Sequence, residues 1–167
     1  MRLALAIVSA VSALILSSCE TMDSGYGYMA NGLDEDSIFE LFALSDEAVN
    51  TRQLEVYQGL FGPGFYILDK TDDFSMAQSR IGRFEYFEFV ERVFREAKEL
   101  VVYSEVLEID FVEPGVRAVV IAQEEQRLHY AGDNKRVVSR VEIEVGFDDG
   151  WIFFESSVTT AKQEIKE

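Results

Sequence analysis

Thiol and imidazole side chains, which bind transition metals and often act in catalysis, are scarce in this 167-residue sequence. The chain has one cysteine, Cys19, and one histidine, His129. A transition-metal site of the usual nitrogen and sulfur kind needs several such residues, so no metal site of that kind is expected. Asp69, Asp72 and Asp73 do not follow the spacing of a calcium-binding loop. The sequence contains no glycine-rich phosphate loop and no serine nucleophile elbow, and we expect no cofactor.

Asp69 is the strongest candidate for acid–base chemistry. It follows the run 65–68, whose composition predicts a short strand, and aromatic residues precede it. A carboxyl group surrounded by aromatic side chains can have a raised pKa and act as a general base. The alternative, which we favour, is that Asp69 is a turn residue at the start of the polar stretch 69–80. His129 precedes the turn 131–134 and is interpreted as a partly exposed strand residue rather than a catalytic group.

The residues around Cys19 point to a different chemistry, the attachment of lipid. Arg2 precedes an apolar run at 3–16, and the tetrad Leu16-Ser17-Ser18-Cys19 follows. This arrangement is typical of a secretory signal peptide, and the run is shorter than the ~20 residues that a membrane-spanning helix needs. The tetrad resembles the lipobox of bacterial lipoproteins, which implies a lipoprotein signal peptide at 1–18 and lipidation of Cys19. The alternative is a plain secreted protein with one thiol.

The lipobox resemblance implies a location in the bacterial cell envelope. In that family the cysteine sulfur receives a diacylglycerol, the chain is cut before it and the new amine is acylated. Several acyl chains make a stable anchor, so the protein would contact the membrane through Cys19. An aspartate after the cysteine favours the inner membrane in many bacteria, whereas Glu20 stands here. The outer membrane, facing the periplasm, is therefore the expected site.

The charge of the chain excludes some classes of partner. The formal net charge is −16 at pH 7. Binding of nucleic acid depends on neutralising phosphates with Lys and Arg, so no nucleic acid partner is expected. Peripheral binding to anionic lipid is disfavoured for the same reason.

The pattern of apolar residues predicts one α+β domain behind a tether. Residues 19–36 are rich in glycine and acid and lack an apolar period, which indicates a flexible acidic tether that is dispensable for folding, with the domain at 37–167. A capping box of Ser37 and Glu40 begins the first predicted helix. Helices are expected at 37–50, 54–61 and 83–100, and strands with period 2 at 102–112, 117–130, 135–147 and 151–160. Short turns join these strands, so the sheet is predicted to be antiparallel.

This order of elements resembles the NTF2-like superfamily, also called SnoaL-like or cystatin-like. The local matches are the Asn50-Thr51 break, Leu60-Phe61 before the first strand, and the turn 148–150 into Trp151. The resemblance implies a cone, in which N-terminal helices pack on a curved antiparallel sheet of four long strands plus one short strand. A pocket would open at its mouth. Sheet-to-sheet dimers are common in the superfamily, so a homodimer through the sheet is a candidate assembly.

The resemblance also implies where chemistry would take place. Asp69 stands where ketosteroid isomerases have their proton-shuttling acid, but those enzymes also need a tyrosine on the first helix, and none stands there. Glu142 and Glu144 lie near the position of the second acid, and their strand parity directs them outward. The Glu124-Glu125 pair most simply marks a bend or a solvated edge. Six aromatic residues are candidates for lining an apolar pocket, or for plain core: Tyr57, Phe65, Tyr66, Phe87, Tyr103 and Trp151.

Together these observations favour a binding function. We expect a lipid-anchored envelope protein whose domain is non-catalytic and binds a small apolar ligand or a protein partner. The alternative is an acid–base lyase or isomerase of the ketosteroid isomerase or SnoaL type that uses Asp69. A cavity of ~300 Å³ or more would be compatible with small-ligand binding or catalysis. A cone filled by side chains would exclude both and would leave binding of a protein partner as the function.

Lipid attachment can be tested directly. We expect Cys19→Ser to abolish acylation and to release the protein from the membrane fraction, because the acyl chains are the predicted membrane contact. Intact-mass measurement of the mature wild-type protein checks this. A wild-type mass without added acyl groups would exclude the lipoprotein interpretation.

Overall fold

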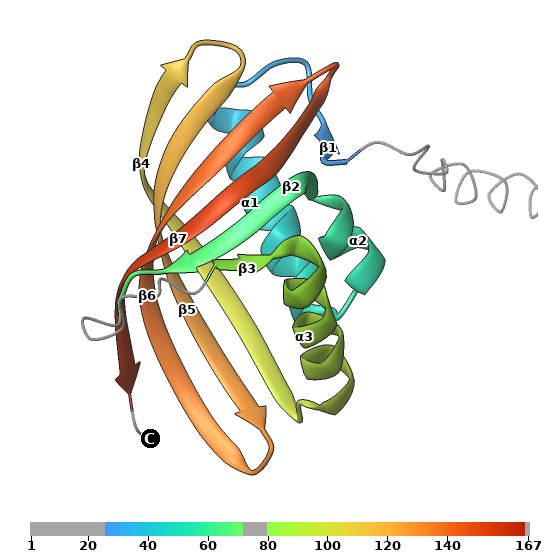
Figure 1. The fold of residues 1–167 in the computed structure, drawn as a ribbon, viewed down its shortest axis with the longest axis vertical. Coiled ribbons are helices and arrows are strands. Elements are labelled where there is room, and N and C mark those ends of the chain that lie inside the picture. Colours follow the sequence, from blue (N-terminus) through green and yellow to red (C-terminus); the bar gives the residue numbers. More distant parts are fainter. Residues whose placement is uncertain (1–25, 72–79, 166–167) are drawn as a thin grey trace, which may run out of the picture.

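The computed structural model describes residues 26–71 and 80–165, which form three helices and a seven-stranded sheet. The helices are α1 (Glu35–Asn50), α2 (Leu54–Gly59) and α3 (Arg83–Glu96). The strands are β1 (Tyr28–Met29), β2 (Phe61–Asp69), β3 (Arg80–Gly82), β4 (Glu99–Glu113), β5 (Arg117–Tyr130), β6 (Asp133–Asp148) and β7 (Trp151–Ile165). The three helices lie together on one side of the long, curved sheet (Figure 1). The expected α+β class is confirmed.

The sheet is mixed rather than wholly antiparallel. Its order is β3-β2-β7-β6-β5-β4, and β1 pairs with the start of β7. Strands β4 to β7 form the expected antiparallel meander. Strand β2, however, pairs parallel to β7, which the expected antiparallel sheet did not include. No short turn joins these two strands, so local turn chemistry could not determine their relative direction.

The first helix begins earlier than the sequence pattern predicts. Its N-cap is Asp34, whose carboxylate accepts a hydrogen bond of 2.8 Å from the amide of Ser37. The hydroxyl of Ser37 in turn accepts one of 3.0 Å from the amide of Asp34. This pair takes the place of the predicted box of Ser37 and Glu40, because an acidic side chain is also a strong N-cap. At the other end of the helical region, α3 ends at Glu96, and β4 starts at Glu99 within the range predicted as helix.

Two side chains of α1 fix this helix to the edge strand β4. The carboxylate of Asp46 accepts hydrogen bonds from both the amide and the hydroxyl of Ser104, each 2.7 Å long. One turn later, the side-chain amide of Asn50 bonds to the carbonyl and the amide of Val102 at 2.9 and 2.7 Å. These β4 groups point away from β5 and would otherwise form an open sheet edge. The helix therefore closes one side of the cone.

The core lies between the helices and the concave face of the sheet. In β6 the side chains of Val141, Ile143 and Val145 are buried, as their alternation predicts. At the base of the cone Phe61 packs against Phe65 and Phe154 with ring centroids 4.5 and 5.1 Å apart. This aromatic base is continuous with α2 through Tyr57 and with α3 through Phe87.

Residues 26–36 pack on the domain, although they were expected to belong to the flexible tether. Tyr28–Met29 pairs with the start of β7, and the Tyr28 hydroxyl donates a 2.5 Å hydrogen bond to Glu40. Leu33 is only 8% exposed. At Gly27, whose φ is +108°, a Cβ atom would collide with the carbonyl of Ile152. The signal peptide at 1–18, Cys19 and the tether up to residue 25 lie outside the described residues.

No helix within residues 26–71 and 80–165 is long and apolar enough to cross a membrane.

Removal of this segment should destabilise the domain. We expect a chain beginning at Asp36 to melt roughly 5–15 °C below one beginning at residue 20, because β1, the buried Leu33 and the N-cap Asp34 are lost. In the full chain, Leu33→Ala should reproduce part of this effect, whereas the exposed Asn31→Ala should not. Thermal unfolding followed by circular dichroism gives the melting temperatures of the two truncated chains and of the two variants. Equal melting temperatures would restore the view of a dispensable tether.

Candidate functional site

The cone encloses a cavity of about 410 Å³, larger than the ~300 Å³ at the lower end for ligand sites. Its deep wall is aromatic and aliphatic, and its outer part carries more polar and more exposed residues. Side chains from all three helices and from β2, β4, β5, β6 and β7 line it. The deep wall includes Phe42, Phe61, Phe65, Val141, Ile143 and Phe154.

One row of polar residues crosses the concave face of the sheet halfway along the cavity. Ser104 of β4 stands opposite Glu124 of β5, Glu124 opposite Ser139 of β6, and Ser139 opposite Lys162 of β7. All four line the cavity. The inward residues of β6 on either side of this row, Val137 and Val141, are apolar. We call the four residues of this row the polar band; other polar side chains, among them Ser157 and Thr159, also line the cavity.

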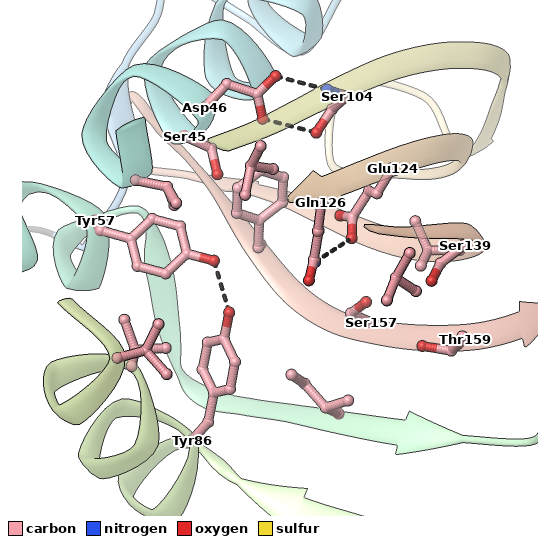
Figure 2. Close-up of a pocket in the computed structure, with 18 of the residues that line it drawn as sticks. Ser45, Asp46, Tyr57, Tyr86, Ser104, Glu124, Gln126, Ser139, Ser157 and Thr159 are labelled. Carbon is pink, nitrogen blue, oxygen red and sulfur yellow. Dashed lines mark hydrogen bonds between the residues drawn. The ribbon is translucent and has the colours of Figure 1, made fainter. Parts of the chain in front are cut away.

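Glu124 is the central group of this band. Its side chain is half-buried and points into the cavity beside Gln126, which is two residues along the same strand face (Figure 2). The side-chain nitrogen of Gln126 donates a long hydrogen bond of 3.5 Å to its carboxylate. Burial, and secondly the negative charge of Asp46, raise the pKa of Glu124 from 4.5 to about 7. A carboxyl group with this pKa exchanges protons readily near neutral pH.

Asp46 supplies a second acidic group from the opposite wall. Burial raises its pKa, and the two hydrogen bonds from Ser104 oppose that rise. Since these bonds also attach α1 to β4, the position of this carboxylate is fixed by the fold itself.

Two phenols add further polar groups to the cavity. The hydroxyl oxygens of Tyr57 on α2 and Tyr86 on α3 lie 2.6 Å apart and form a hydrogen bond (Figure 2). Burial raises the pKa of both phenols, so each remains neutral at physiological pH. One hydroxyl proton occupies the shared bond, which leaves the other free to be donated to a ligand.

The six aromatic residues predicted for the pocket lie in different places. Tyr57 and Phe65 line the cavity, together with Tyr86, which was not among the six. Phe87 packs in the core against Tyr57 instead. The other three lie elsewhere: Tyr66 beneath the guanidinium of Arg80, Tyr103 63% exposed, and Trp151 opposite Met29 of β1. Tyr103 precedes Ser104 on β4 and so faces the opposite side of the sheet.

Asp69 does not have the surroundings that a general base requires. It lies at the end of β2 outside the cavity lining, and its carboxylate accepts hydrogen bonds of 2.9 and 2.6 Å from the amide and hydroxyl of Thr71. These bonds lower the pKa of Asp69, the opposite of the effect that a base needs. Glu142 and Glu144 face away from the cavity, and Glu144 accepts a 3.0 Å bond from Ser156.

The remaining candidates also lie outside the cavity. His129 is half-buried near the end of β5, opposite Glu99 of β4. No group of three or more acidic, histidine or cysteine side chains that could hold a metal ion occurs in the part of the chain that the structure describes.

The Glu124-Glu125 pair was interpreted as a bend or a solvated edge, and Glu124 is the main candidate site residue that sequence reasoning missed. The signal was available, because Ala118, Val120 and Ala122 alternate on the buried face and Glu124 continues the same parity. Its neighbour Glu125, on the outer face, forms ion pairs with Arg127 and Arg136. The two adjacent acids therefore differ in environment and in role.

Comparisons with known proteins identify the fold. No protein-family model matches the chain, and no match was found among curated proteins. Solved structures do match. A protein assigned as a scytalone dehydratase from Novosphingobium aromaticivorans has a TM-score of 0.63 at 17% identity, covering 79% of this chain and 87% of its own. An NTF2-like protein from Cytophaga hutchinsonii has a TM-score of 0.63 at 13% identity, covering 77% and 99%.

A third match is a hexachlorocyclohexane dehydrochlorinase (LinA type 2), with a TM-score of 0.58 at 13% identity, covering 78% of this chain and 88% of its own. Such low identities show the fold alone. The expected NTF2-like cone is confirmed as the fold of this chain.

The protonation of Glu124 can be measured without a ligand. Because the folded state keeps a proton on Glu124 up to about pH 7, and a free carboxyl releases it near 4.5, stability should fall as the pH rises between these values. We expect Glu124→Gln to remove this loss and to be more stable than the wild type near pH 8, by up to about 3 kcal/mol. Denaturant unfolding and NMR titration of the carboxyl check both points. Glu142→Gln, the same charge change on the opposite face, is the control. A carboxyl that titrates below about pH 5 would contradict the assignment.

Proposed function

We propose that this protein is a lipid-anchored envelope protein whose domain binds a small, largely apolar molecule inside the cone. The observation that carries the proposal is the cavity of about 410 Å³ with its apolar deep wall. Burial of apolar surface contributes roughly 25 cal/mol per Å², so a small hydrocarbon body that fills this space is bound with useful affinity.

The polar band gives such a ligand an orientation. Binding sites for small molecules commonly combine apolar walls with a few polar groups that fix the ligand. Here the polar groups include Glu124 of the polar band and the pair formed by Tyr57 and Tyr86, whose rings pack against the aromatic base. A ligand with one polar group and an apolar body matches this distribution.

The anchor part of the proposal depends on the sequence around Cys19. A lipidated Cys19 would hold the domain at the envelope membrane, and the Glu at position 20 favours the outer membrane. The acyl chains supply the membrane affinity that an acidic domain lacks.

An acid–base enzyme is the second candidate, and Glu124 favours it. Its pKa of about 7 suits a group that takes up and releases protons, and the neutral phenols of Tyr57 and Tyr86 could donate to a developing negative charge. In this version Glu124 replaces Asp69 as the proton-transferring group. The candidate reactions are the elimination or isomerisation of a small apolar substrate.

A molecule that co-purifies with the protein distinguishes the two candidates. Recovery of this molecule unchanged after prolonged incubation supports a binding protein. Conversion that disappears in Glu124→Gln and persists in Asp69→Asn supports the enzyme. Conversion that requires Asp69 would contradict the assignment of Glu124.

Filling the cavity should block binding. Thr159 lines the cavity, whereas Thr160 on the same strand is exposed on the other face, so the two residues form a matched pair. We expect Thr159→Phe to lower the affinity for the neutral dye N-phenyl-1-naphthylamine about tenfold or more, and Thr160→Phe to leave it within about twofold. Fluorescence titration, with circular dichroism to confirm folding, measures the effect. Equal affinity in both variants would mean that the dye binds elsewhere, and the proposal would fail.

A further inference from the structure

We propose that the cavity selects molecules that join an apolar body to a positively charged amine, with the amine at the carboxylate of Glu124. This inference rests on the proposed binding function and specifies the class of ligand. It is based on the two carboxylates that face the cavity and on the unused hydrogen-bond acceptor capacity of Glu124.

Two carboxylates face the cavity without an ion-pair partner. The ion pairs between residues of 26–71 and 80–165 involve other acids, none of them Asp46 or Glu124. Both groups lose part of their hydration to burial, which is costly for a charge that has no counter-charge. A bound cation offsets that cost, whereas an anionic ligand adds a third negative charge.

Hydrogen bonding separates the two acids and singles out Glu124. Asp46 already accepts two bonds of 2.7 Å from Ser104. Glu124 accepts one bond of 3.5 Å from Gln126, and its two oxygens can accept about four. An ammonium group has three donors to offer and forms strong, charge-assisted bonds. A ketone or an ether has no donor and leaves this capacity unused.

Other titratable or charged groups around the cavity do not remove this preference. Tyr57 on α2 and Tyr86 on α3 are neutral phenols, and Asp46 on α1 adds to the negative potential. Lys135 of β6 and Lys162 of β7 line the outer part and are exposed, so their ammonium groups stay hydrated. Lys162 stands in the row of Glu124 but two strands away, about 10 Å between Cα atoms.

The position of the polar band also defines the shape of the ligand. On β6 the row is flanked by the apolar residues Val137 and Val141, whereas Gln126 of β5 and Thr159 of β7 add polar groups beside it; the aromatic base lies beyond Val141. The apolar body therefore fills the deep end while the amine remains at mid-depth. A primary or secondary amine on a short hydrocarbon body satisfies both conditions.

Three probes of equal chain length test this inference: n-octylamine, n-octanol and n-octanoate. Isothermal titration calorimetry near pH 8, at about 0.15 M salt to screen the net charge of the protein, gives their affinities. We expect octylamine to bind about tenfold or more tightly than the other two. This preference should weaken below pH 7, where Glu124 takes up a proton while the amine stays charged.

Two variants connect the preference to the site. Glu124→Gln should remove the preference for octylamine and keep the binding of octanol. Glu142→Gln makes the same change of charge on the opposite face and should keep the preference. A preference for octylamine that survives in Glu124→Gln would show general attraction to an acidic protein and would overturn the inference.

Each remaining outcome overturns one of the two proposals. Equal binding of octanol and octylamine, or tighter binding of octanoate, overturns the amine inference and leaves the binding function in place. Binding of the neutral dye without binding of octylamine likewise overturns the amine inference and leaves the binding function in place. If neither the dye nor any of the three probes binds, the proposed function itself fails.

Discussion

The attachment of α1 to the edge strand β4 is the interaction on which the rest of this structure depends. Asp46 and Asn50 satisfy the outward backbone groups of Ser104 and Val102, which closes the open edge of the sheet. The same contact forms one wall of the cavity. It also holds a carboxylate close enough to Glu124 to raise its pKa. One structural hydrogen-bond pair thus determines part of the electrostatics of the site.

The cavity exists because the concave face of the sheet carries small side chains where larger ones would fill it. Ser139 of β6 and Ser157 of β7 occupy such inward positions in the cavity lining. Protein interiors are normally packed to the density of organic crystals, so an unfilled space of this size costs stability. The aromatic base, where rings meet edge to face, restores part of that stability at the closed end.

The sequence predicted local structure better than the site. Period 2 and turn chemistry located the four long strands, and the buried face of β6 followed from alternation alone. Contacts between distant segments were not predictable in this way: the parallel pairing of β2 with β7, and the packing of Leu33 and β1 on the domain. The parity of β5 also pointed inward at Glu124, but the Glu124-Glu125 pair was interpreted as a bend or a solvated edge. Asp46, the partner of Glu124, lies on another element, so no local pattern indicated a buried acidic pair.

The chain enters the fold at one end of the sheet, and the cavity is most exposed at the other. Strand β1 pairs with Trp151 and Ile152 at the start of β7, while Lys162 near its end belongs to the exposed part of the cavity wall. About 35 Å of strand separates these positions. A domain held by its N-terminal end therefore carries its entrance on the side remote from the point of attachment. With the proposed anchor at Cys19, the entrance would face the surrounding aqueous compartment, and a ligand would arrive by diffusion through water rather than by lateral transfer out of a bilayer.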